Sequence, residues 1–267
     1  MRVVALLTDF GLKDNFAGVM KGVILKINPS VNFVDITHNV EPQNIFEGAF
    51  LLYQSFKFFP EGTVFLSVVD PGVGSERKAV AVKAGRYYFV GPDNGLLSLA
   101  VKEEGVDKIV ELVNKKYFLP RVSSTFHGRD VFAPAAGFLS SGVKIEKLGR
   151  EGEKIKEISI PNPVFKDKEI YFDVLYIDRF GNIITNMENI DFIDKTRNKK
   201  FKCSVNGRCI EHFCSAYDLV PDEGILSFLP GSSGFIEVSL KNASASEFLN
   251  IKKRSRLRVD LMKSKPR

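Results

Sequence analysis

The chain has 267 residues, of which 44% are hydrophobic and 26% charged, so it carries ample apolar material for a folded core. No apolar run is long enough to span a membrane, and three cysteines give no disulfide framework, so we expect a cytoplasmic protein without a membrane partner. The net charge of +6 makes a nucleic-acid partner worth considering, but the lysines are scattered, and we expect no such partner.

The first 150 residues alternate apolar runs typical of buried strands with segments of helical periodicity. Phe16, Met20, Val23, Ile24 and Ile27 recur at the spacing of one helix face, and Asn28-Pro29 ends that helix. The expected strands cover residues 2–9, 31–37, 63–70, 78–84, 86–93 and 108–113, and the expected helices cover 14–27, 44–59, 95–104 and 131–142. This alternation predicts an α/β domain with a mostly parallel sheet that helices flank on both faces.

The composition changes near residue 150, where a charged stretch with two prolines, residues 150–169, shows no strong periodicity. We place a boundary inside it and expect an α/β domain at 1–160 and a second domain at 161–267. The second part is strand-like, and Asn206-Gly207 is a strong signal for a two-residue hairpin. It predicts a small antiparallel β-barrel or sandwich, and the basic residues from 252 onward are expected to form a solvated tail.

The stretch "VVDPGVGSERK", residues 68–78, places Asp70 at the end of an expected strand, with Arg77 in the loop that follows. Its glycines do not match a phosphate loop, because that loop needs GxxxxGK[ST] and the dinucleotide turn needs GxGxxG opening a helix. Asp9 also falls at a strand end, and ligands of such sheets bind at that edge. Taken alone, the stretch is better explained by a β-turn with a surface ion pair.

Other polar stretches have structural explanations beside functional ones. "TFHGRDVFAPAAG" holds His127, which suits a partly apolar pocket, and Asp130, which could cap the helix that follows. "IDRFGNIITN" holds Asp178 and Asn182, and both residue types are also common in hairpin turns. From these residues alone, each stretch fits a structural role at least as well as a site.

The cysteines do not have the CxxC spacing of a zinc site. If the chain turns at residues 206–207, Cys203 faces Ile210 while Ser204 faces Cys209. The two cysteines then point to opposite faces of the hairpin and cannot share a metal or a disulfide. We therefore expect no metal and no cofactor.

Eight motifs occur in order along the chain: "LLTDFG", "MKG", "ITH", "EGAFLL", "VVDPGVGSER", "GPDNGLL", "FHGRDVFAPAA" and "DRFGNIITN". Together they resemble the S-adenosylmethionine (SAM) hydroxide adenosyltransferases, or SAM hydrolases, which are relatives of the fluorinase and chlorinase enzymes. The resemblance covers nearly the whole chain. It is strong through residue 187 and looser afterwards, where "GSSGFIEVSLKNASA" is the remaining match.

The resemblance implies an α/β domain, a small β domain, and a homotrimer with sites between the first domain of one subunit and the second domain of its neighbour. The hydrolase branch has a water-handling set that matches Asp70, Arg77 and His127, and the halogenases lack this set. The other implied contacts are Asp9 for the ribose hydroxyls, Asp178 for the methionine ammonium, Asn182 near adenine, and Phe126 and Ser233 elsewhere on the ligand. Gln43 stands where relatives often carry an aromatic residue.

We therefore predict an enzyme that hydrolyses SAM to adenosine and L-methionine by in-line attack of water on the ribose 5′ carbon. The sulfonium makes methionine a good leaving group, so the site needs only a positioned nucleophile. Asp70 would accept a proton or a strong hydrogen bond from the water, Arg77 would fix Asp70, and His127 would orient the water. The alternatives are halide-dependent adenosyl transfer at the same carbon, and a non-catalytic module that binds an adenosyl ligand or nucleic acid.

Overall fold

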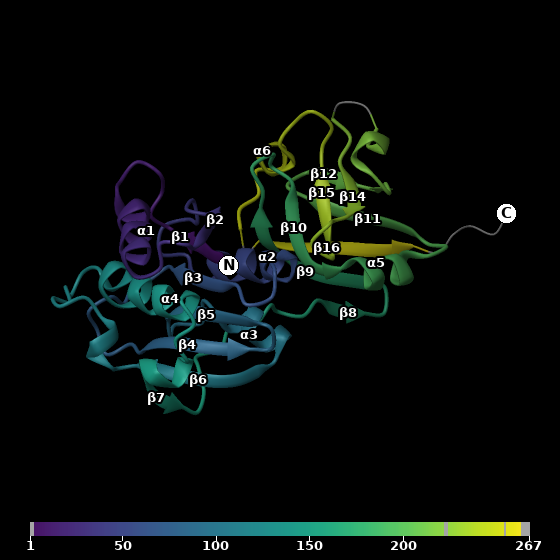
Figure 1. The fold of residues 1–267 in the computed structure, drawn as a ribbon. Coiled ribbons are helices and arrows are strands. Elements are labelled where there is room, and N and C mark those ends of the chain that lie inside the picture. The colour runs from purple at the N-terminus through teal and green to yellow at the C-terminus, as the bar shows by residue number, and fades with distance from the viewer. Residues whose placement is uncertain (1–2, 222–223, 254, 263–267) are drawn as a thin grey trace. The chain divides into compact units, whose positions relative to one another are not determined.

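The computed structural model describes residues 3–221, 224–253 and 255–262. The chain divides into two compact units, Met1–Ser159 and Ile160–Arg267, which we call unit 1 and unit 2. Figure 1 shows the course of the chain through both units. Among the helices in the described ranges, none combines the length and apolar character that crossing a membrane requires.

Unit 1 is built around one sheet with helices on both of its faces. Its strands are β1 (Val3–Thr8), β2 (Asn32–Thr37), β3 (Val64–Val68), β4 (Ala79–Ala84), β5 (Tyr87–Pro92), β6 (Val106–Leu112) and β7 (Gly149–Gly152). Its main helices are α1 (Phe16–Ile27), α2 (Ile45–Ser55), α3 (Ser98–Glu104) and α4 (Ala133–Ser140). The strand order is β2-β1-β3-β5-β4-β6-β7.

The alternation of side chains along β1 explains these layers. Val4 and Leu6 pack with Met20 of α1 and with α4, whereas Ala5 and Leu7 pack on the opposite face with residues of α2 and α3. All four side chains of β1 are fully buried, because a strand with helices on both faces has no solvent-facing side. Within unit 1, Figure 1 shows α1 and α4 together on one face of the sheet.

The prediction of a mostly parallel sheet is wrong for half of unit 1. β2, β1, β3 and β5 run parallel to one another, but β4, β6 and β7 join them in antiparallel pairings. The cause is the short connection between β4 and β5, which consists of Gly85 and Arg86. A two-residue loop can only return the chain as a hairpin, and the φ of +43° at Gly85 suits such a turn.

Unit 2 holds the second sheet, with strands β8 (Val164–Lys166), β9 (Glu169–Ile177), β10 (Ile183–Glu188), β11 (Lys200–Val205), β12 (Arg208–Ile210), β13 (His212–Phe213), β14 (Ser227–Pro230), β15 (Phe235–Ser239) and β16 (Arg256–Met262). The strand order is β12-β11-β16-β9-β10-β15-β14-β13, and β8 pairs with β9. The pairings are antiparallel apart from β13 with β14. The short helices are α5 (Asn189–Thr196) and α6 (Ala245–Leu249).

Two details of unit 2 differ from the prediction. The sheet is nearly barrel-shaped rather than a closed barrel, because the described pairings do not join its end strands β12 and β13. The expected solvated tail contains β16, which lies between β11 and β9 with Leu257 and Val259 fully buried. Basic residues at alternate positions hid this strand in the sequence.

The hairpin of β11 and β12 has the predicted register. Cys203 is paired with Ile210 and Ser204 with Cys209, and residues 206 and 207 both have positive φ. Cys203 is buried while Cys209 is exposed, so the two thiols lie on opposite faces. Burial raises the pKa of the Cys203 thiol to about 12, which keeps it protonated at neutral pH.

Candidate functional site

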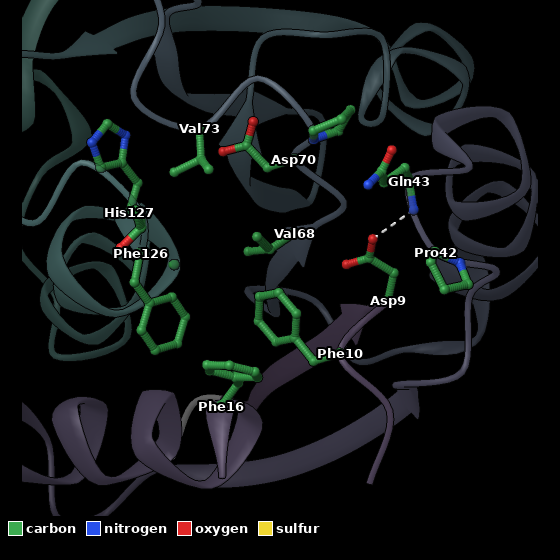
Figure 2. A pocket seen from close by; sticks show the side chains of 13 residues that line it. Asp9, Phe10, Phe16, Pro42, Gln43, Val68, Asp70, Val73, Phe126 and His127 are labelled. Atoms are coloured by element: carbon green, nitrogen blue, oxygen red, sulfur yellow. Dashed lines mark hydrogen bonds between the residues drawn. The ribbon is translucent and has the colours of Figure 1, made fainter. Parts of the chain in front are cut away.

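A cavity of about 420 Å³ lies in unit 1 at the ends of β1 and β3, which we call the first cavity (Figure 2). β1 and β3 are parallel neighbours, so the residues that follow them meet at the same edge of the sheet. The cavity is lined by Asp9, Phe10, Phe16, Pro42, Gln43, Val68, Asp70, Pro71, Val73, Thr125, Phe126, His127 and Gly128. The expected strand-end carboxylates, Asp9 and Asp70, therefore share one cavity.

The loop after β3 holds a buried ion pair. Arg77 Nε donates to Oδ1 and Oδ2 of Asp70 at 2.9 and 3.0 Å, and Nη2 donates to Oδ2. The side chains of Arg77 and Asp70 are only 7% and 6% exposed. The interpretation of this stretch as a β-turn with a surface ion pair is therefore wrong, because the ion pair is buried. Arg77 does not line the cavity and supports Asp70 from behind, with its guanidinium 5.2 Å from the ring centre of Phe132.

A glycine lets this loop close against the segment that carries His127. Gly74 has a φ of +78°, and a Cβ at this position would lie 2.3 Å from the carbonyl oxygen of Ser124. Only glycine combines this backbone conformation with so close an approach. The glycines of the loop thus serve to bring Asp70 and Arg77 near residue 127, rather than to surround a phosphate.

Arg77 also holds His127. Its Nη2 lies 2.8 Å from Nδ1 of the imidazole, and because a guanidinium can only donate, Nδ1 must be the acceptor. Burial lowers the pKa of His127, and the charge of Arg77 lowers it further. The ring is therefore neutral at pH 7 with its proton on Nε2. One guanidinium fixes a carboxylate acceptor and an imidazole N–H donor around the same cavity.

Asp9 follows β1 directly and faces the cavity beside Gln43 (Figure 2). Its Oδ2 accepts a hydrogen bond of 2.8 Å from the backbone N–H of Gln43. Gln43 has a φ of +65°, a conformation that is uncommon for a residue with a side chain. This backbone bond places Asp9 opposite His127 in the cavity.

Aromatic rings form the wall below these polar groups in Figure 2. The ring centre of Phe126 lies 5.8 Å from that of Phe10 and 5.2 Å from that of Phe16, both in edge-to-face arrangements. The Phe10 and Phe16 rings are 5.4 Å apart. The cavity thus offers an apolar wall and two carboxylates, which suits a ligand with both apolar and cationic or hydroxyl groups.

Unit 2 contains a second cavity, of about 570 Å³, which we call the second cavity. It is lined by Asp178, Phe180, Asn182, Tyr217, Leu240, Asn242, Ala243 and Ser244. Most of these residues come from the turn between β9 and β10 and from the segment after β15, and Tyr217 comes from a short 3-10 turn, Tyr217–Leu219, that follows β13. The charged side chain in this lining is the carboxylate of Asp178, so the lining favours a cationic or hydrogen-bonding ligand group.

Asp178 is fixed by the turn that carries it. Its Oδ1 accepts from the N–H groups of Phe180 and Asn182 at 2.9 and 2.8 Å, and its Oδ2 accepts from Asn182 Nδ2 at 2.9 Å. Asn182 Oδ1 in turn accepts from Ser239 on β15 at 2.7 Å. At Gly181, with φ +84°, a Cβ would lie 2.1 Å from Ser244 Oγ. The turn therefore packs directly on the segment that completes the cavity.

A buried carboxyl, Glu237 on β15, stands behind the second cavity. Glu237 is 5% exposed, and the hydroxyl of Tyr217 donates to its Oε2. Burial raises the pKa of Glu237, the nearby Asp178 raises it further, and the Tyr217 hydrogen bond lowers it only in part. Burial and Glu237 together raise the pKa of Tyr217 as well. Tyr217, which lines the cavity, is therefore held in place by a hydrogen bond to Glu237, a carboxyl group whose ionisation is disfavoured.

Both parts of the chain match models of one protein family. The model of the SAM hydroxide adenosyltransferase N-terminal domain matches residues 4–149, and that of the C-terminal domain matches residues 172–258. The chain belongs to the SAM hydroxide adenosyltransferase family. The two matched segments fall one in each unit of the structure.

Individual proteins of this family match over nearly their full length. The chain is 34% identical to an (R)-S-adenosyl-L-methionine hydrolase of Salinispora arenicola, covering 96% of this chain and 97% of that one. It is 37% identical to the hydrolase of the same name from Thermus thermophilus, covering 94% and 97%. A crystal structure of an uncharacterized conserved protein from Thermotoga maritima superposes with a TM-score of 0.90 at 36% identity, covering 96% and 99%. Fluorinases match at 28–29% identity over 69–71% of this chain.

The structure gathers the sequence-predicted residues into separate groups. Asp9, Asp70, Phe126 and His127 line the first cavity with Arg77 behind them, and Asp178 and Asn182 line the second. Ser233 does not line the second cavity and lies in the turn before β15. Asp130 does not cap α4, because it accepts from Ser123 N and pairs with Arg129.

The sequence did not predict the contacts that Gln43, Tyr217 and Glu237 make. Gln43 reaches Asp9 through its backbone, which no side-chain pattern reveals. Tyr217 and Glu237 are separated by 20 residues, and only the fold joins them. A polar residue inside the apolar strand "FIEVS" was the available signal for Glu237, because a buried carboxyl needs a partner.

Proposed function

We propose that this protein hydrolyses SAM to adenosine and L-methionine. The observation that carries the proposal is the hydrogen-bonded set of Asp70, Arg77 and His127 at the edge of the first cavity, in which the Asp70–Arg77 ion pair is buried. Hydrolases related over the full chain support the same reaction. Their names specify the (R) form of the sulfonium, so we expect the (R) epimer to be the substrate here as well.

The reaction needs a positioned water more than any other assistance. The water oxygen forms a bond to the ribose 5′ carbon as the carbon–sulfur bond breaks, and the electron pair of that bond stays on sulfur, which becomes the neutral thioether of methionine. Asp70 accepts the proton that the water loses, and Nε2–H of His127 donates to the water oxygen. General-base assistance contributes about 10²–10⁴ in rate, or roughly 3–5 kcal/mol of the barrier.

Arg77 makes this arrangement rigid. It fixes both groups through one planar guanidinium, so the acceptor and the donor keep a constant spacing. A rigid pair can align the water with the carbon–sulfur bond before the substrate reacts, and such alignment is a large source of rate enhancement. The set therefore acts as a unit, and we expect the loss of any one member to reduce turnover strongly.

The ligand contacts follow from the same proposal. Asp9, held by Gln43 N–H, binds the ribose hydroxyls in the first cavity, and Phe126 adds apolar contact. Asp178 binds the methionine ammonium and Asn182 the adenine, with Ser233 nearby in the assembled site. Since these residues belong to different units, we propose a homotrimer in which unit 2 of one subunit completes the site of its neighbour.

An isotope experiment tests the reaction directly. The protein is incubated with (R)-SAM in ¹⁸O-labelled water, and the products are separated by chromatography and weighed by mass spectrometry. We expect adenosine with ¹⁸O at its 5′ oxygen, together with unlabelled methionine. Parallel reactions with added fluoride or chloride address the alternative, because a 5′-halogenated nucleoside would favour halide transfer. No product under any of these conditions would favour a module that binds an adenosyl ligand without reacting.

A further inference from the structure

Two loops at one edge of the unit 1 sheet carry Asp9 and Gln43 into the first cavity. The loop after β1 and the loop after β2 are joined by a hydrogen bond of 2.7 Å from Gly11 N–H to the carbonyl of His38. The bond between Asp9 and Gln43 N–H joins them a second time. The direction of the Asp9 carboxylate therefore depends on how these loops are held together.

A buried histidine joins the loops through its side chain. His38 is 3% exposed, and its Nδ1 lies 2.9 Å from Oγ1 of Thr8, which is fully buried at the end of β1. The same Oγ1 accepts a hydrogen bond of 3.2 Å from Phe10 N–H. His38 is thus connected, through one hydroxyl, to the residues on both sides of Asp9.

The opposite side of the ring faces a carboxylate. His38 Nε2 lies 3.1 Å from Oδ1 of Asp35, although its N–H is not aligned for a good hydrogen bond, so the contact is mainly electrostatic. Asp35 Oδ2 accepts from Lys21 on α1 at 2.6 Å. Burial raises the pKa of Asp35, but Lys21 and His38 outweigh burial and hold it below its usual range. An ionised carboxylate beside Nε2 favours the ring proton there, which leaves Nδ1 to accept from Thr8.

We propose that His38 is a positioning residue that sets the direction of Asp9 through Thr8. His38 does not line the first cavity, so it acts on the ligand only through the loop. The inference rests on the proposed function, in which Asp9 binds the ribose hydroxyls. It explains why a histidine, rather than an apolar residue, fills a fully buried place next to the cavity.

The test measures binding rather than turnover. Adenosine and 2′-deoxyadenosine are titrated into the full-length protein by calorimetry, and the ratio of their dissociation constants reports contact with the 2′ hydroxyl. We expect His38→Leu and Thr8→Val to reduce the preference for adenosine about tenfold, the factor that one good hydrogen bond contributes. His38→Asn, whose amide oxygen can replace Nδ1 as the acceptor, should restore most of the preference.

A matched control separates positioning from general loss of stability. Thr63→Val also removes a buried hydroxyl, which donates to the Pro60 carbonyl at 2.7 Å, but it lies at the far end of β3 from the cavity. This variant should keep the parent preference even if its melting temperature falls as much as that of His38→Leu. Circular dichroism and melting temperature are recorded for every variant.

A double-mutant cycle decides whether the effect passes through Asp9. In an Asp9→Ala background, His38→Leu should change the nucleoside preference no further. Three outcomes would each overturn the proposal. Folded His38→Leu could keep the full preference for adenosine, or His38→Leu could cause an equal additional loss of preference in the Asp9→Ala background. The third is that the parent protein binds both nucleosides equally. Failure to release adenosine from SAM would instead reject the proposed function, and the binding measurement would still stand.

Discussion

Arg77 contacts two groups of opposite hydrogen-bonding character, the acceptor Asp70 and the imidazole of His127, whose free N–H is a donor. The contact with Arg77 determines which nitrogen of His127 carries the proton. Because Arg77 occupies Nδ1, protonating His127 would place an N–H against the guanidinium. The water-handling role that we propose for this set therefore requires the neutral form of the His127 ring.

Replacing Asp70 should remove proton acceptance while leaving the ligand in place. Asp70→Asn keeps the shape of the side chain and an oxygen for Arg77, so we expect the fold to survive. Turnover should fall about 10²-fold or more, the usual contribution of a general base, with the dissociation constant for SAM nearly unchanged. Single-turnover kinetics and calorimetry on the same preparation measure the two quantities. A variant that binds SAM poorly but reacts normally once bound would contradict the assigned role.

The pH dependence of turnover should reflect His127. Burial and the Arg77 charge hold its pKa below its ordinary value of 6.5, so the neutral ring predominates at pH 6.5 and above. As pH falls further through this lowered pKa, the ring becomes charged and its bond with Arg77 is lost. We expect kcat at saturating SAM to be flat above pH 6.5 and to fall below it. His127→Gln should lose this acidic limb, and a fall that begins above pH 7 would exclude the assignment.

Single-residue patterns predicted the components of the site but not their contacts. Asp9 and Asp70 could be placed at one sheet edge because each follows an apolar strand. His127 is 50 residues from Arg77, and no local pattern joins them, so only the family resemblance suggested that set. His38, Tyr217 and Glu237 escaped prediction because their partners are set by tertiary packing.

At the scale of elements, β15 places a carboxyl group in the interior of unit 2. Alternation along the strand puts Ile236 and Val238 in the apolar core and leaves Glu237 on the opposite face, where it meets Tyr217. The pKa of Glu237 is raised, so folding favours its protonated form. Protonated Glu237 contributes fully to the stability of the fold at pH values below its pKa in the unfolded chain. This contribution is lost as the pH rises through its pKa in the folded protein.

Glu237→Gln should therefore stabilise the protein at neutral pH. Glutamine cannot ionise, and its amide oxygen can still accept from Tyr217. We expect the melting temperature to exceed that of the parent by about 2–4 °C at pH 8, as a change near 1 kcal/mol produces, and the difference to vanish near pH 4.5. Thermal unfolding across this range measures it. Tyr217→Phe, which leaves Glu237 buried without its donor, should destabilise instead.

The elements that the sequence predicted poorly are those whose neighbours are distant or whose pattern is mixed. The helix that ends at Asn28-Pro29 and the 206–207 hairpin carry local signals and form as predicted. β4 and β5 were found as strands, but their direction depended on recognising Gly85-Arg86 as a turn. β16 was missed because charged residues alternate with Leu257 and Val259, which is the pattern of a half-exposed strand.

For the whole molecule, the proposed homotrimer can be tested by complementation. Asp70→Asn alters unit 1 and Asp178→Ala alters unit 2, and each variant alone should have strongly reduced activity. If subunits share sites, trimers formed by refolding a mixture should regain activity, because some interfaces combine an intact unit 1 with an intact unit 2. Mixed trimers confirmed by native mass spectrometry but lacking all activity would favour a site within one chain. Each variant refolded alone serves as the control.

Because β16 lies between β11 and β9, the unit 2 sheet cannot be completed until the end of the chain has been synthesised. β9 is made about 80 residues before β16, which corresponds to roughly 4–16 s at 5–20 residues per second. During that time, the side of β9 that will pair with β16 remains an open edge next to the buried faces of Ile170 and Phe172. A nascent chain halted before residue 256 should therefore have a folded unit 1 and an incomplete unit 2 sheet whose exposed edge and apolar side chains promote association. Chaperone capture and aggregation assays on stalled ribosomes can detect this exposure.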